Sequence, residues 1–394
     1  MGDPIVIVGA RRTAMGGFQG DLAPALATDL GAAAIAAALT QAGLQTEAVD
    51  EVIMGCVLAA GQGQAPARQA ALKAGLPRGA GATTVNKMCG SGMKAAMFAH
   101  DILRAETASV VIAGGMESMT NAPYLLPKAR GGYRMGHGQV IDHMFLDGLE
   151  DAYDKGRLMG TFAEDCAEAY QFSREAQDAW AITSLERAKD ATSKGYFSAE
   201  IAGVTVKGGK GELLIDRDEQ PGKARPDKIP TLKPAFRANG TVTAANSSSI
   251  SDGAAALVMM RSSESERRGL KPLAIVSGHA TYADAPNLFP TAPIGAIKKL
   301  ATKTGWNLRD VDLFEINEAF AVVAMAAMHE LRLPREKVNI HGGACALGHP
   351  IGASGARVLV TLLSALETYG MKKGIASLCI GGGEATAVAI ERIV

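Results

Sequence analysis

Short β-branched runs alternate with alanine-rich stretches from the N-terminus onward, and this alternation limits the fold more than any other feature of the chain. The β-branched runs have the composition of strands, and the alanine-rich stretches have the length of helices. Strand and helix in regular succession predict an α/β protein. In order, the segments are Ile5–Val8, Thr28–Ala42, Glu51–Gly55, Thr83–Asn86, Met93–Glu106 and Ser109–Gly115.

The same motifs return in the second part of the chain, after a loop-rich stretch with polar helices around Phe162–Lys194. The paired segments are Ala48–Gly55 with Asp310–Asn317, Asn86–Ala95 with His341–Arg357, and Ser109–Ser118 with Ile375–Ala385. One glycine-rich resemblance arises readily by chance, whereas three in the same order are harder to dismiss. We expect two similar α/β halves, residues 1–119 with 247–267 and residues 268–394, and an inserted domain over residues 120–246.

Composition excludes several classes of function. The 394 residues carry 40 Lys and Arg against 40 Asp and Glu, which argues against a nucleic-acid or membrane-surface protein. The five cysteines are odd in number and form no CxxC pair, so we expect neither a disulfide framework nor a metal site. No signal segment is evident at the N-terminus, and no apolar run approaches the roughly 20 residues of a membrane span. The expectation is a soluble, cytoplasmic protein.

Cys89 stands in VNKMCGSGMKAA, between a strand-like run and a helix. Unpaired N–H groups and the helix dipole at such a position favour a thiolate. Gly90 and Gly92 are expected to leave space for a substrate and to permit unusual backbone angles. A lone cysteine is more often a buried, inert side chain, but this setting makes a nucleophile equally plausible.

A cysteine nucleophile needs a base, and His349 in GACALGHPIGASG is the best-placed histidine because glycines surround it. The alternative is a turn histidine held by local hydrogen bonds. Cys379 ends a strand-like run before three glycines, where N–H groups can converge on an oxyanion. Taken alone, Cys379 reads more simply as a core residue. Asn317 in FEINEAFA suits a ligand amide or a helix N-cap, and Glu318 suits an acid or a first-turn charge.

Together, NKMCGSGMKA, GGMESM, NEAFA, GGACALGHPIGASG and CIGGG resemble the thiolases, in that order and over essentially the whole chain. The likeness is greatest to short, bacterial-type acetyl-CoA acetyltransferases. It implies a duplicated five-layer αβαβα fold with an inserted loop domain. It further implies reversible Claisen condensation of two acetyl-CoA to acetoacetyl-CoA and CoA, with coenzyme A thioesters as substrates and no tightly bound cofactor.

The resemblance also implies a role for each site residue. Cys89 becomes acetylated, and His349 takes its proton. Asn317 holds a water that completes the first oxyanion hole, and the N–H groups of Cys89 and Gly381 form the second. Cys379 protonates the departing CoA and then removes the α-proton of the second acetyl-CoA.

Coenzyme A contacts are carried over from the family positions. They are Ser248, Ala244, Leu149, Met159, Phe236, Ala319 and Phe320, although core packing explains the apolar ones almost as well. In place of the usual arginine and serine near the nucleotide the chain has PGKARPDK. Lys223, Arg225 or Lys228 are candidate substitutes, although a solvated charge run explains any one of them better. Leu158 replaces a histidine, Glu384 replaces a methionine, and Phe289 stands near a usual acyl-pocket methionine. The loop Asn121–Gln139 corresponds to the segment through which relatives form tetramers, so a homotetramer, a dimer of dimers, is expected.

Three alternatives remain open on sequence grounds. The nearest is a 3-ketoacyl-CoA thiolase of β-oxidation that accepts longer chains. A cysteine hydrolase would use Cys89 and His349 and leave Cys379 idle. A non-catalytic CoA-binding protein would form no acyl-enzyme.

Overall fold

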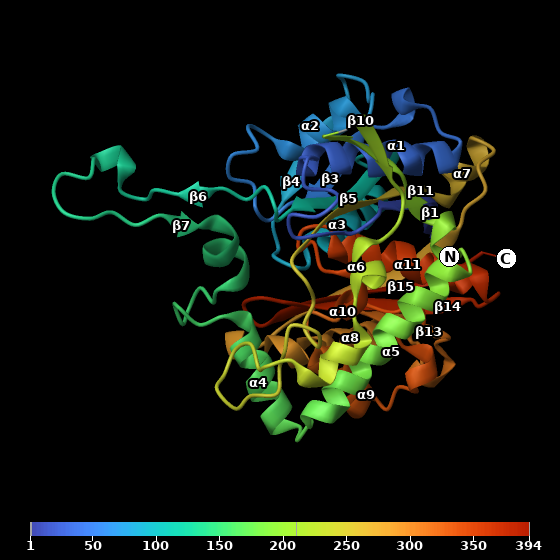
Figure 1. Ribbon diagram of the computed structural model, residues 1–394. Coiled ribbons are helices and arrows are strands. Elements are labelled where there is room, and N and C mark those ends of the chain that lie inside the picture. Colours follow the sequence, from blue (N-terminus) through green and yellow to red (C-terminus); the bar gives the residue numbers. More distant parts are fainter. Residues whose placement is uncertain (1, 210, 394) are drawn as a thin grey trace.

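The strands of both halves join in one hydrogen-bonded sheet, which the computed structural model describes over residues 2–209 and 211–393 (Figure 1). Its strand order is β13-β14-β15-β12-β1-β11-β5-β3-β4. Within this sheet, the strands of the two halves are joined where β1 and β12 pair, at Val6 with Ile275 and Ile7 with Ala274. The strands are β1 (Ile5–Thr13), β3 (Glu51–Gly55), β4 (Gly81–Val85), β5 (Val110–Ser118), β11 (Ser251–Arg261), β12 (Ala274–Ala283), β13 (Leu313–Ile316), β14 (Lys373–Ile380) and β15 (Glu384–Arg392).

The pairing pattern confirms the internal repeat. In the first half, β3 runs parallel to β5, and β11 pairs antiparallel with both β5 and β1. In the second half, β13 runs parallel to β14, and β15 pairs antiparallel with both β14 and β12. A parallel bridge between Phe314 and Val338 takes the place that β4 has beside β3.

Helices form three layers around and between the two halves of the sheet (Figure 1). α1 and α2 cover the first half from outside, α8 and α9 cover the second, and α3 and α11 pack against each other in the middle. The middle core joins Met93 of α3 and Val358 of α11 to strands of both halves, including Val111 and Leu378. The expected five layers are therefore present. The helices are α1 (Ala27–Ala42), α2 (Pro66–Lys73), α3 (Ser91–Arg104), α8 (Ala292–Thr304), α9 (Ala321–Leu331) and α11 (Ser354–Thr368).

Close contact between α3 and α11 depends on glycine. A Cβ on Gly92 would stand 2.8 Å from the Ala356 nitrogen, and a Cβ on Gly355 would collide with the backbone of Met93. α11 is buried along almost its whole length, as an apolar helix inside a protein must be. This crossing fixes the position of Cys89, just before α3, relative to His349, just before α11.

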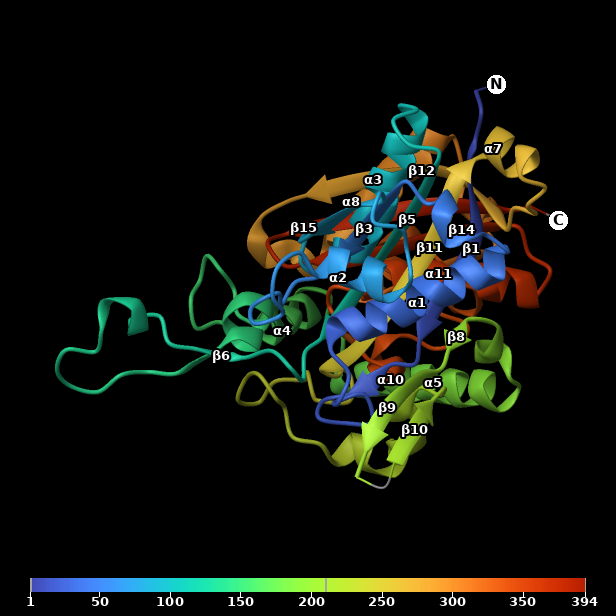
Figure 2. The same ribbon diagram turned by 90° about the horizontal axis from the view of Figure 1, so that it is seen from above.

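The chain leaves the sheet after β5 and returns to it at β11. The intervening segment contributes α4 (Met159–Ala169), α5 (Arg174–Ser193) and a hairpin of β9 (Val204–Gly208) with β10 (Gly211–Ile215). It also forms an extended arm, pinned by β6 (Tyr124–Leu125) and β7 (Ile141–Asp142), which projects from the body in both views (Figures 1 and 2). The domain limits expected from the sequence stay a prediction.

Short elements complete the description: β2 (Gly16–Gly17), β8 (Ile201–Ala202), α6 (Glu219–Lys223), α7 (Ser262–Arg267) and α10 (Ala344–Leu347). Over residues 2–209 and 211–393, no helix combines the length and the apolar character needed to cross a membrane.

Candidate active site

A cavity of about 380 Å³ opens where the two halves and the inserted segment meet. It brings together the predicted site residues except Asn317 and the three basic side chains. The predicted residues that line it are Cys89, His349, Cys379, Gly381, Ser248, Ala244, Leu149, Met159, Phe236, Ala319 and Phe320. Leu158 and Phe289, two of the departures from the family pattern, also line it.

Cys89 lies on a tight turn between β4 and α3. Gly90 caps the helix, which begins at Ser91, so the predicted position of the cysteine is confirmed. The Ser91 hydroxyl donates to the Met88 carbonyl at 2.6 Å and accepts the Lys87 N–H at 2.8 Å, which locks the turn. Met88, immediately before the nucleophile, has a φ of 47°. A non-glycine residue in this region stores backbone strain, which is common at functional sites.

The two glycines beside Cys89 serve a different purpose from the one expected. Gly90 has an ordinary φ of −83°, so the prediction that it permits unusual angles is wrong. A Cβ there would collide with Ile380, which precedes the glycine turn of the second half. Gly90 and Gly92 therefore allow the second half to approach the nucleophile closely, and the unusual backbone angle falls on Met88.

Burial of the Cys89 thiol has more effect on its pKa than the nearby N–H donors. Burial raises the pKa of Cys89 to about 11, although the N–H groups of Gly381 and of Cys89 itself act in the opposite direction. The expectation that the helix start favours a thiolate is therefore wrong, because desolvation outweighs the donors. Both N–H groups nevertheless point at the sulfur, as a pair of oxyanion donors beside it would.

His349 is buried and neutral, with one ring nitrogen facing the cavity. Its Nδ1 lies 2.6 Å from the Ser354 hydroxyl, which donates to the Pro350 carbonyl at 3.0 Å. The hydroxyl oxygen is therefore free to accept the Nδ1 proton, which leaves a lone pair on Nε2. Nε2 has no partner among the described residues. Burial, helped by the charge of Arg357, lowers the pKa of His349 to about 3. The ring is therefore a neutral base at physiological pH.

Asn317 lies behind His349 and outside the cavity lining. Its amide nitrogen stands 3.4 Å from His349 Nδ1, and its amide oxygen accepts a hydrogen bond of 3.2 Å from buried Arg357. Phe320, not Asn317, is the N-cap of α9, so the helix-cap alternative is wrong.

Cys379 is buried near the end of β14, just before the glycine turn. Its pKa lies well above the usual value, first because of burial and second because of the nearby Cys89 sulfur. Gly382 and Gly383, with φ of 93° and 86°, bend the chain back into β15, and Gly381 lines the cavity beside both sulfurs. Two thiols, a neutral imidazole and converging N–H groups around one cavity are the parts of an acyl-transfer site.

Family models for the N-terminal and C-terminal domains of thiolase match residues 5–263 and 270–392. The chain belongs to the thiolase family. An acetyl-CoA acetyltransferase of Chromobacterium violaceum is 49% identical over 390 residues, which is 98% of this chain and 99% of that protein. Acetyl-CoA acetyltransferase 2 of Arabidopsis thaliana is 50% identical over 391 residues, 98% and 96% of the two chains.

Two solved structures confirm the thiolase fold. The Bacillus anthracis acetyl-CoA acetyltransferase superposes with a TM-score of 0.96 at 40% identity and covers 99% of both chains. The Acat5 thiolase from Ascaris suum, in complex with coenzyme A, superposes with a TM-score of 0.94 at 39% identity. That match covers 99% of this chain and 100% of the other.

Sequence reasoning missed three buried polar residues of this thiolase that hold the catalytic loops. Ser354 and Arg357 contact His349 and Asn317, as described above. Glu117, at the end of β5, accepts the N–H groups of Val57 and Gly352 at 2.9 Å each. It thereby ties the His349 loop of the second half to the first half. Burial raises the pKa of Glu117 to about 7 despite these donors. GGMES and GASGAR contain these residues, but only the fold reveals their partners.

Other predicted residues lie away from the cavity lining. Lys223 pairs with Glu219 and, at 3.2 Å, with Asp21, whereas Arg225 and Lys228 are exposed. Glu318 is a structural anchor, because it accepts hydrogen bonds from Ser184 at 2.8 Å, Asn339 at 2.8 Å and the Cys345 N–H at 3.1 Å.

Glu384, the replacement for a family methionine, forms an ion pair with Lys87. This pair joins the nucleophile turn to the first residue of β15.

Proposed function

We propose that this thiolase is an acetyl-CoA C-acetyltransferase that joins two acetyl-CoA molecules into acetoacetyl-CoA and releases CoA. The main support for this proposal is that Cys89, His349 and Cys379 line one cavity. The N–H groups of Cys89 and Gly381 lie beside the Cys89 sulfur. The acetyl-CoA acetyltransferases that resemble the chain over almost its whole length support the same activity.

In the first half-reaction, Cys89 Sγ attacks the thioester carbon while its proton moves to His349 Nε2. We expect the His349 imidazolium to hold the tetrahedral oxygen; the water on Asn317, a residue outside the cavity lining, stays a prediction. The bond to the CoA sulfur then breaks, and CoA leaves with the proton of Cys379. Each well-aimed oxyanion donor contributes roughly 3–4 kcal/mol to such a step.

In the second half-reaction, the Cys379 thiolate removes an α-proton from a new acetyl-CoA. A thiolate with a raised pKa is a correspondingly stronger base, which suits removal of a proton from carbon. The enolate carbon attacks acetyl-Cys89, whose carbonyl oxygen is held by the N–H groups of Cys89 and Gly381. Cys89 leaves as a thiolate and regains its proton from His349, so the cycle closes with all protons returned.

Intact-mass analysis after exposure to acetyl-CoA, followed by peptide mapping, tests the proposal directly. We expect one acetyl group on Cys89, none in Cys89→Ala, and no turnover by that variant in either direction. Cys379→Ser should still become acetylated but lose most carbon–carbon bond formation. Cys166→Ala, a buried cysteine outside the cavity lining, is the matched control and should retain both steps. Wild-type condensation by Cys379→Ser, or release of free acetate as the main product, would instead favour the hydrolase.

Chain-length range separates the acetyltransferase from a broader 3-ketoacyl-CoA thiolase. Phe289 and Leu158 both line the cavity, and we propose that their bulk favours the acetyl group over longer acyl chains. We expect thiolysis of acetoacetyl-CoA to be faster than thiolysis of a 3-ketoacyl-CoA with a longer chain. Comparable kcat/KM values for both substrates would assign the broader activity.

The phosphates of coenzyme A require basic side chains near the cavity mouth. We propose Arg225 and Lys228, because both are exposed and because Ala235 and Phe236, a few residues further on, line the cavity. Lys223 is the weaker candidate, since its ammonium pairs with two carboxylates. Arg225→Ala and Lys228→Ala should raise KM for CoA with little change in kcat, and Lys271→Ala serves as a control. Unchanged KM in both variants would reject the assignment.

The arm supports assembly into a homotetramer. It exposes Tyr124, Leu126, Met135 and Val140, and Met135 is 97% exposed. Apolar side chains gathered on a projecting segment are typical of an association surface. Light scattering after size exclusion should give a tetramer for the native chain and a smaller species for Leu126→Glu/Met135→Glu. Leu213→Glu, at an exposed leucine of β10, is the control. A monomeric native chain would contradict the proposal, and the cytoplasmic location stays a prediction.

A further inference from the structure

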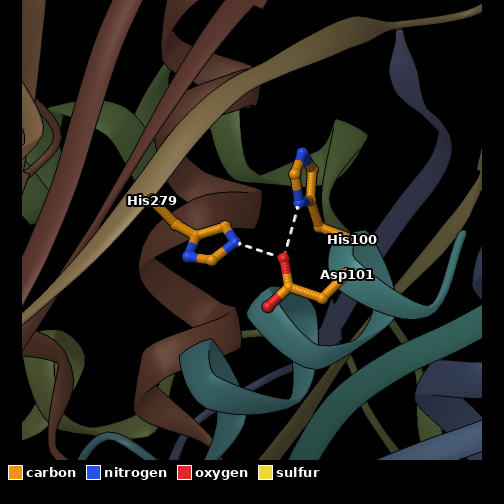
Figure 3. Close-up of side chains that lie close together, drawn as sticks. All are labelled: His100, Asp101 and His279. Atoms are coloured by element: carbon orange, nitrogen blue, oxygen red, sulfur yellow. Dashed lines mark hydrogen bonds and ion pairs between the residues drawn. The ribbon is translucent and has the colours of Figure 1, made fainter. Parts of the chain in front are cut away.

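A cluster of two histidines and an aspartate lies between the two halves of the molecule and outside the catalytic cavity. His100 and Asp101 come from the last turns of α3, and His279 comes from β12 (Figure 3). The Asp101 Oδ1 lies 3.1 Å from His100 Nδ1 and 2.9 Å from His279 Nε2. The three atoms all lie within 4.8 Å of one another.

We propose that His100, Asp101 and His279 bind one Zn²⁺ ion, with the fourth position open to water. In a tetrahedral site with ligands about 2.0–2.1 Å from the ion, ligand atoms are roughly 3.4 Å apart. The two distances from a histidine to Asp101 are slightly shorter than this, so modest side-chain rotation is enough to admit the ion. Two imidazoles with one carboxylate favour Zn²⁺ over Mg²⁺ or Ca²⁺, which prefer oxygen ligands.

Protonation of the cluster suits a metal. Burial lowers the pKa of both His100 and His279, although Asp101 acts in the opposite direction. Neutral imidazole is the form that coordinates metal, so few protons need to be displaced from the rings near pH 7. Without a metal, each of these nitrogens donates to the Asp101 carboxylate, so each ring must move its proton to its other nitrogen when a metal binds.

Positively charged side chains near the cluster affect both metal binding and the protonation of the histidines. Lys303 donates to the His279 carbonyl at 3.1 Å, and Lys94 and Arg104 also face the cluster. These cations oppose a free metal ion, and they also favour neutral imidazoles. Binding therefore depends on all three ligands acting together, and loss of any one should weaken it at least about tenfold.

A bound Zn²⁺ would link the C-terminal end of α3 to β12 of the second half. Cys89 lies just before the N-terminal end of the same helix. The sequence gives no sign of this site, because Asp101 and His279 are 178 positions apart. The proposal differs from the expectation that the chain has no metal site. The inference does not depend on the proposed acyltransferase activity.

The test is a Zn²⁺ titration of the full chain, without a polyhistidine tag and with accessible cysteines alkylated so that thiols do not compete. We expect one equivalent to bind and to raise the Tm by a few degrees. His279→Gln and His100→Gln should lose at least tenfold in affinity, whereas His137→Gln, in the exposed arm, should not. Co²⁺ should give a visible ligand-field spectrum without the charge-transfer band of thiolate ligands.

Asp101→Asn is a third ligand variant that should keep the fold, because asparagine is nearly isosteric with aspartate and still accepts a hydrogen bond. Circular dichroism verifies that the fold is retained. Failure of the native chain to bind Zn²⁺, or equal binding by the native chain and the three ligand variants, would show an ordinary hydrogen-bonded cluster and overturn the proposal.

Discussion

Removal of the Ser354 hydroxyl should slow catalysis although Ser354 does not line the cavity. The hydroxyl stands 2.6 Å from His349 Nδ1, and both side chains are buried. In Ser354→Ala the remaining polar neighbour of Nδ1 is the Asn317 amide nitrogen at 3.4 Å, which is itself a donor. A donor favours the tautomer that carries its proton on Nε2. That tautomer cannot accept the proton of Cys89.

The size of the effect follows from the cost of the lost contact. A buried donor or acceptor left without its partner costs about 1–3 kcal/mol. Because about 1.4 kcal/mol corresponds to a tenfold change in rate, kcat should fall about 5- to 150-fold. KM should change little, since Ser354 does not line the cavity.

Single-turnover acetylation of Cys89, followed by rapid quenching and mass analysis, measures the affected step directly. Ser364→Ala is the matched control, because Ser364 is a buried serine of the same helix whose hydroxyl has no partner among the described residues. Native acetylation rates in Ser354→Ala, with an unchanged Tm, would refute the argument that this hydroxyl sets the tautomer. A fall in Tm with an unchanged rate would reduce Ser354 to a structural residue.

Four further outcomes follow from the geometry. Gly92→Ala should lower stability by about 1–3 kcal/mol in chemical denaturation, because its Cβ meets the α11 backbone, whereas Gly79→Ala should be neutral because its Cβ meets nothing within 4 Å. Glu384→Gln should cost about 0.5–1 kcal/mol in kcat/KM, and the difference from the native enzyme should shrink in high salt, because it breaks the partly exposed pair with Lys87. The Tm should fall as pH drops below 6.5. In the folded chain the pKa values of His349 and His341 are lowered to about 3 and about 4, so below pH 6.5 these histidines bind protons in the unfolded chain but not in the folded one. The pKa of Glu117 is raised to about 7, so this residue contributes stability that is lost as pH rises from 4.5 through 7. Glu117→Gln should therefore reduce the dependence of Tm on pH between 4.5 and 7.

Much of the architecture was predictable because it depends on local patterns. The run EVIMG forms β3 over the expected residues, and the helix after Cys89 begins two residues beyond it. The internal repeat predicted two matching halves, since the same order of strands and turns needs the same pairing. The cavity lining was predictable through the family resemblance, which marks positions even where residue type alone leaves core packing as an equal explanation.

Partners and protonation states were not predictable, because they depend on contacts between distant segments. Ser354 lies only five residues after His349, but the sequence does not show that its hydroxyl turns toward the ring. The helix start at Cys89 correctly suggested nearby N–H donors. It did not reveal that burial raises the pKa of the Cys89 thiol more than these donors lower it. Lys223 looked available as a basic residue, but Asp21, far along the chain, pairs with it.

The two halves share one topology but contribute unequally to the site, and glycine explains how they are joined. By the pairing of β3 with β5 and of β13 with β14, Gly55 corresponds to Asn317, and Met116 corresponds to Cys379. The first half therefore lacks polar groups where the second half has them. A Cβ on Gly55 would stand 2.7 Å from the Gly352 oxygen, and one on Gly115 would collide with the same atom. These bare positions let the His349 loop dock against the first half, where Glu117 accepts the Gly352 N–H. The two halves thus contribute different parts of the site: the first half carries Cys89 and a bare surface, and the second half brings His349 to Cys89 across that surface.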